Sequence, residues 1–183
     1  MIMSSPAFDT RKFPPDRFTF TAREHLMTTK ATKLRQLHFE TFDDILVDVQ
    51  TLQDASDIQL GGQWTAAQNI DHIRRFMTMS REGTTVKAPL WLRILGRFLR
   101  GGIGKNAIPS GFKIPPAFEA QFVPPDDITM DQAVANLRSE IELAKVPGSM
   151  SQPSPLFGKL SYEKWYALHL RHAELHLGNV APV

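Results

Sequence analysis

One stretch near the C-terminal end, WYALHLRHAELHL (residues 165–177), decides both the fold and the candidate chemistry. Its histidines His169, His172 and His176 stand at i, i+3 and i+7, so on a helix they share one side with Trp165. We therefore expect a helix here that turns three imidazoles toward the protein interior. Burying several imidazoles without partners would cost on the order of a few kcal/mol, because each ring has polar atoms to satisfy.

The pair His172 and His176 has the i, i+4 spacing at which two imidazoles can chelate one metal ion. The residues by themselves leave two interpretations open. Either the pair binds a metal, or both rings form hydrogen bonds to neighbouring helices.

A metal in this chain would have to be held by nitrogen or oxygen, because the sequence contains no cysteine. Among the other histidines, His72 is the best candidate for a third ligand, since it lies inside a predicted core helix. His25 and His38 lie in or beside the N-terminal arm and are poor candidates. His169 competes with His72, although a role as a hydrogen-bond donor behind the ligands fits it better.

Hydrophobic periodicity and capping residues predict four long helices, and strand signals are almost absent apart from a short extended piece at 37–39. The predicted helices cover residues 41–54, 65–80, 129–145 and 161–177, with Thr41, Thr65, Thr129 and Ser161 as N-caps. Proline- and glycine-rich connections cover 101–125 and 147–158. This pattern predicts an all-α, up-and-down four-helix bundle with a long loop between its second and third helices.

An additional short amphipathic helix is expected over 88–100. Its apolar residues share one face: Leu90, Trp91, Ile94, Leu95 and Phe98. Its arginines lie on another face: Arg93, Arg97 and Arg100. One interpretation is a covering helix with a solvated basic edge. The other is a patch that binds a membrane surface or an anionic ligand.

Length and composition limit the remaining possibilities. The 183 residues suit one domain, which we place at 36–183, after an irregular arm at 1–35. The net charge of +2 and the lack of a basic tract interleaved with aromatics argue against nucleic acid binding. We expect no membrane span and no signal peptide, and therefore a cytoplasmic protein.

Two strings carry a resemblance to known proteins. GGQWTAAQNIDHI (61–73) resembles the helix-two signature of the DinB-like superfamily, which includes YfiT-like metal-dependent hydrolases and thiol-dependent transferases. The segment 155–177 is more specific and, with LHFETFDDIL (37–46), resembles a branch catalogued only as a domain of unknown function. The resemblance covers about residues 36–178.

The resemblance implies a DinB-like bundle in which His72, His172 and His176 hold a divalent ion, with zinc or nickel the expected metals. Three protein ligands leave positions for water, which is typical of catalytic rather than structural sites. Such an ion would lower the pKa of a bound water molecule or activate a thiolate.

Further residues around this site have alternative roles. Trp64 either walls the pocket or secures the start of its helix. Asn69, one turn before His72, either orients His72 or binds substrate, or it forms a hydrogen bond between helices. Glu174 falls roughly opposite His172 on the helical wheel and is expected to be solvated, and Arg171 is expected to be a surface charge.

The leading hypothesis is a metal-dependent enzyme, either a hydrolase or a thiol-dependent transferase, that acts on a small molecule such as a low-molecular-weight thiol. A non-catalytic metal-binding or stress-response protein is the alternative. A third hypothesis is a helical interaction module that uses segment 88–100. Bundles of this layout often pair through helix faces, so a homodimer is an alternative to a monomer.

Overall fold

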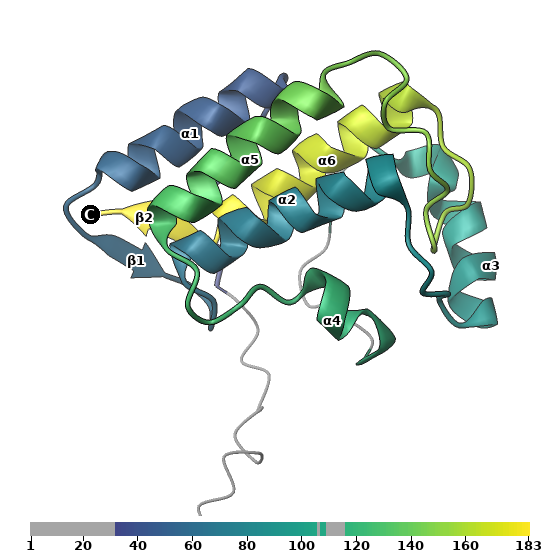
Figure 1. The fold of residues 1–183 in the computed structure, drawn as a ribbon, viewed down its shortest axis with the longest axis horizontal. Coiled ribbons are helices and arrows are strands. Elements are labelled where there is room, and N and C mark those ends of the chain that lie inside the picture. The colour runs from purple at the N-terminus through teal and green to yellow at the C-terminus, as the bar shows by residue number, and fades with distance from the viewer. Residues whose placement is uncertain (1–31, 106, 109–115) are drawn as a thin grey trace, which may run out of the picture.

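A computed structural model describes residues 32–105, 107–108 and 116–183 of the chain (Figure 1). The described part is mostly helical, as expected, and has one small antiparallel sheet. Four long helices lie side by side in Figure 1: α1 (Phe42–Asp54), α2 (Ala66–Glu82), α5 (Met130–Ala144) and α6 (Tyr162–Leu177). α2 packs against α5 and α6, and α1 packs against the same two helices. The core therefore lies between these four elements.

The starts of the long helices follow the predicted caps. Three of the four helices begin with a complete capping box, and their caps are Thr41, Thr65 and Thr129. In each box the cap hydroxyl accepts a hydrogen bond from the amide of the third helical residue. The side chain of that third residue accepts one from the amide of the cap. Ser161 forms only half of this arrangement, because its partner position is Lys164. Each cap residue keeps an extended backbone, so each helix begins one residue later than predicted.

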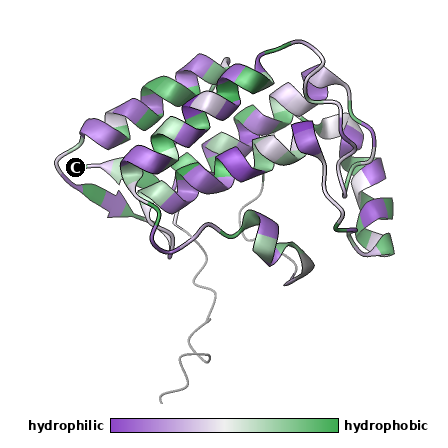
Figure 2. Ribbon diagram, viewed as in Figure 1, coloured by the Kyte–Doolittle hydropathy of each residue, from purple (hydrophilic) through white to green (hydrophobic). Residues whose placement is uncertain are grey.

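The helix interiors follow the predicted periodicity. In Figure 2 each long helix carries hydrophobic and hydrophilic residues in turn along its ribbon, and the hydrophobic ones supply the core. Trp165 is fully buried, and its indole nitrogen donates to the carbonyl of Gln152 at 3.0 Å. This bond satisfies the one polar atom of the side chain and ties the loop before α6 to the core.

Two short strands were not predicted. β1 (Ile58–Leu60) pairs antiparallel with β2 (Val180–Pro182), with Leu60 opposite Val180. Gly61 follows β1 where a Cβ atom would lie 2.0 Å from the carbonyl oxygen of Thr32, so the close approach requires glycine. Residues 37–39, the extended piece expected from the sequence, form no strand.

The connection at 101–125 is less irregular than predicted. It contains the 3-10 turns η2 (Arg100–Gly102) and η3 (Pro116–Phe118) and the short helix α4 (Glu119–Phe122). Phe118 and Phe122 are buried, and α4 contacts α2. Burial of these two aromatic rings holds α4 against α2.

The predicted arm lies mostly outside the described residues, since its first 31 positions are not described. Its last part contacts the helical region: the amides of Leu34 and Arg35 donate to the carbonyl of Gly178. The guanidinium of Arg35 also pairs with Asp48 at 2.6 Å. The division into an arm and a domain at residue 36 remains a prediction.

The amphipathic segment forms α3 (Leu90–Leu99) at one end of the molecule (Figure 1), but its apolar side does not cover the core. Leu90, Trp91 and Phe98 are exposed by 65% or more. The expectation of a covering helix with an inward apolar face is therefore wrong. Among the described residues, none of the helices combines the length and the apolar character that crossing a bilayer requires.

Candidate metal centre

Three histidines from two adjacent helices converge inside the protein. His72 comes from the middle of α2, and His172 and His176 come from consecutive turns of α6. Each offers a ring nitrogen, and these nitrogens all lie within 4.8 Å of one another. His72 and His172 are buried, and His176 is partly buried. The structure thus brings together the three residues that the sequence singled out.

The orientation of His72 is set by the chain that covers α2. Its Nδ1 lies 2.7 Å from the backbone carbonyl of Phe122 at the end of α4. A carbonyl oxygen only accepts, so Nδ1 carries the proton and Nε2 keeps its lone pair. A ring nitrogen bonded to a backbone carbonyl is the usual arrangement behind a metal-binding imidazole, because it fixes both tautomer and ring orientation.

His172 has a buried nitrogen with no partner. Its Nδ1 forms no hydrogen bond within the described part of the chain, and the ring packs against Phe76 with centroids 4.3 Å apart. An unpaired buried polar atom costs about 1–3 kcal/mol. Among the described residues, hydrogen bonds from Nδ1 to neighbouring helices therefore do not account for the burial of this ring.

The electrostatics of the cluster favour neutral imidazoles. Burial lowers the pKa of His72 to about 4, against a partial opposing effect of the Phe122 carbonyl. Burial also holds the pKa of His172 and of His176 well below the usual range, and repulsion from the neighbouring imidazoles adds to this. Neutral rings keep their lone pairs available, which is the form that binds a metal.

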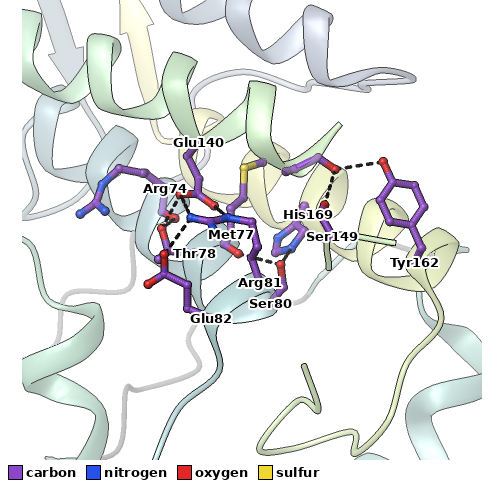
Figure 3. Close-up of polar contacts among 11 residues, drawn as sticks. Arg74, Met77, Thr78, Ser80, Arg81, Glu82, Glu140, Ser149, Tyr162 and His169 are labelled. Atoms are coloured by element: carbon purple, nitrogen blue, oxygen red, sulfur yellow. Dashed lines mark hydrogen bonds and ion pairs between the residues drawn. The ribbon is translucent and has the colours of Figure 1, made fainter. Parts of the chain in front are cut away.

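His169 belongs to a separate contact. Its Nε2 donates to the hydroxyl of Ser80 at 2.9 Å, and that hydroxyl donates onward to the carbonyl of Met77 at 2.6 Å (Figure 3). The ring stacks on Trp165, with centroids 5.4 Å apart. His169 is thus hydrogen-bonded to α2 through Nε2. The other ring nitrogen of His169, Nδ1, is buried without a partner among the described residues.

Trp64 lies directly against the cluster. Its ring centroid is 4.8 Å from that of His72 and 6.0 Å from that of His176, on which it is stacked. Of its two predicted roles, this position fits a wall of the site. The indole shields two of the three imidazoles on the side where α2 begins.

Among the described residues, the side-chain amide of Asn69 forms no hydrogen bond to His72 or to another helix. Its amide nitrogen donates to the carbonyls of Trp64 at 3.2 Å and Thr65 at 2.9 Å, within its own helix start. These bonds satisfy carbonyls near Trp64 and leave His72 to be oriented by Phe122. Asn69 therefore helps to hold the backbone of Trp64 in place beside the histidines.

The expectations that Glu174 is solvated and Arg171 a surface charge are wrong. Glu174 is buried, accepts from the amide of Phe39 at 2.7 Å and pairs with Arg171 at 3.0 Å. The helical wheel places Glu174 away from His172 correctly, but the segment before α1 covers that side of α6. Both residues attach this segment and do not take part in the cluster.

The surroundings include groups that sequence patterns do not reveal. The carbonyl of Phe122 acts on His72 from 50 positions away, and a backbone acceptor leaves no residue signature. A surface hollow of about 560 Å³ lies near the C-terminal end of α2 and is lined by residues 82–86, 120, 121 and 152. That hollow includes none of the three clustered histidines.

The fold and the cluster define a class: a mostly helical protein whose three adjacent histidines can hold a metal ion. A family model described as "Protein of unknown function (DUF1569)" matches residues 31–183, and the chain belongs to that family. The expected resemblance to a domain of unknown function is thereby confirmed. No curated protein and no solved structure matches the chain.

Proposed function

We propose that this protein is a metal-dependent enzyme of the DinB-like type, with His72, His172 and His176 holding one divalent zinc or nickel ion. The observation that carries this proposal is the approach of three histidine ring nitrogens to within 4.8 Å of one another, two of them on buried side chains. Zinc–nitrogen bonds of about 2.1 Å separate tetrahedral ligands by about 3.4 Å, so small side-chain shifts would complete the set.

Each residue around the proposed centre has a specific task. The Phe122 carbonyl holds the proton of His72 on Nδ1, so that the lone pair of Nε2 remains free to bind the ion. Trp64 packs against the ring of His72 and Phe76 against the ring of His172, which limits how far these imidazoles can turn. When bound, a divalent ion with three protein ligands supplies Lewis-acid chemistry, which suits hydrolysis or the transfer of a group to a small thiol.

Metal analysis of purified protein is the direct test. We expect about one equivalent of zinc or nickel in the wild type and a marked loss in the His172→Ala/His176→Ala double variant. His38→Gln is the matched control, because it removes an exposed histidine outside the cluster. Equal metal content in the wild type and the double variant would overturn the proposal.

A non-catalytic metal-binding protein is the second candidate, and the burial of His72 and His172 favours it because it restricts access to the ion. The two candidates differ in whether the metal accepts an additional ligand. Adding a small thiol to nickel-loaded protein should produce a sulfur-to-nickel charge-transfer band if a position is open. If the absorption spectrum of the nickel-loaded protein does not change on addition of a thiol, azide or imidazole, the result would support the non-catalytic role.

A further inference from the structure

Helix α3 presents a large apolar surface to solvent. Phe98 is 82% exposed, and Leu90 and Trp91 are exposed by about two thirds. The rest of this surface consists of Ile94, Leu95 and Leu99. Contiguous apolar surface of this kind on a soluble domain usually marks an interaction site.

The direction of this surface is set by how α3 docks. A Cβ atom on Gly96 would lie 2.4 Å from the carbonyl oxygen of Leu156, so the helix backbone sits directly on the loop before α6. Leu92, one turn earlier, is partly buried on the same side. On the helical period Phe98 and Trp91 then lie on the opposite side, away from the domain.

The stretch of sequence that contains α3 carries charges of one sign only. Between Glu82 and Glu119 the sequence contains no acidic residue and six basic ones: Lys87, Arg93, Arg97, Arg100, Lys105 and Lys113. The rest of the chain has 15 basic and 19 acidic residues, so the net positive charge of the protein comes from this segment. Arg93 and Arg97 lie on one flank of α3, between its docked side and its apolar side, and Arg100 directly follows the helix.

We propose that α3 docks the protein on the surface of a bilayer that contains anionic phospholipids. A convex helix with exposed leucines and aromatics can bury its apolar side at the boundary of headgroups and acyl chains, while flanking arginines reach the phosphates. Trp91 suits that boundary because its ring is apolar and its N–H is polar. A second copy of this chain fits less well, since a two-fold contact would bring two arginine flanks together.

Vesicle sedimentation with the full chain tests the proposal. We expect binding to mixed phosphatidylcholine–phosphatidylserine vesicles, weaker binding as salt is raised, and little binding to phosphatidylcholine alone. Phe98→Asp should lower the partition coefficient by roughly tenfold or more. Val47→Asp is the matched control, because Val47 is 68% exposed on α1, and it should leave binding unchanged.

Two further variants test the electrostatic part and the orientation. Arg93→Gln should weaken vesicle binding by about fivefold, whereas Arg138→Gln on α5 should not. Vesicles should shift tryptophan emission to shorter wavelength in the wild type, and Trp91→Phe should abolish that shift.

Three results would overturn the proposal. They are absence of vesicle binding by the wild type, equal binding to neutral and anionic vesicles, and equal binding by the Phe98→Asp and Val47→Asp variants. Size-exclusion chromatography tests the alternative, in which a second copy of the chain covers the apolar side of α3. A wild-type dimer that Phe98→Asp dissociates, without vesicle binding, would assign this face to a second copy.

Discussion

Acidification of the metal-free protein provides a sharp test of the buried imidazoles. Burial lowers the pKa of His72 to about 4 and that of His169 to about 3, and it holds the pKa of His172 well below the usual range. In the unfolded chain each of these side chains titrates near 6.5. The unfolded state therefore binds more protons than the folded state as the pH falls below that value.

The sign and size of the effect follow from proton linkage. Stability that is present above about pH 6.5 is lost as the pH falls, because each folded-state pKa is the lower one. At about pH 5.5 each histidine that stays neutral in the fold lowers the free energy of unfolding by about 1.4 kcal/mol. These three groups lower it by about 4 kcal/mol, and His176, whose pKa is also held well below the usual range, adds to the loss. A domain of this size has only about 5–15 kcal/mol.

Urea denaturation after chelator treatment, followed by far-ultraviolet circular dichroism, measures this loss. We expect the midpoint to fall steeply between about pH 7.5 and 5.5, with an unchanged slope against urea. The fall should persist in His38→Gln, whose histidine is exposed, and should be smaller in His169→Phe. A change below about 1 kcal/mol over this range would refute the burial of neutral imidazoles.

Three substitutions test other parts of the structure by the same urea assay. His172→Leu should stabilise the metal-free protein by about 1–3 kcal/mol, because it removes an unpartnered buried nitrogen, while abolishing any stabilisation by added zinc. Trp165→Ala should cost about 3–5 kcal/mol, since the side chain is fully buried. Glu174→Ala should cost about 3–5 kcal/mol because it leaves Arg171 without its carboxylate, and a cost near zero would show that this ion pair is solvated.

The parts of the fold predicted correctly depend on local patterns. Thr65 and Gln68 stand three positions apart, so their capping box can be read within four residues of sequence. The His172 and His176 pair is likewise one turn of a single helix. The predicted core helix made His72 the best candidate for the third ligand. Spacing along the chain does not reveal which helices become neighbours, so the resemblance was needed to favour His72 over His169.

The parts that were missed depend on long-range contacts. The strand pair joins Leu60 to Val180, and three-residue strands lack a hydrophobic period of their own. For α3 the sequence shows that one side is apolar, but not that Gly96 docks the helix with that side outward. The burial of Glu174 requires the amide of Phe39, which lies 135 positions away.

The lowered pKa values also predict how metal affinity responds to acid. At an exposed trio of histidines that titrate near 6.5, protons at about pH 5.5 would compete roughly tenfold at each ring and about a thousandfold in total. Here burial lowers the pKa of His72 to about 4 and holds that of His172 and His176 well below the usual range, so the folded protein has almost no protons to release. We therefore expect the affinity of the folded protein for zinc, measured by competition with a chelator of known proton affinity, to change less than about threefold between about pH 7.5 and 5.5. A loss of zinc affinity approaching a thousandfold would mean that the zinc-binding rings are solvated before the metal binds. It would contradict the burial of His72 on α2 and of His172 on α6.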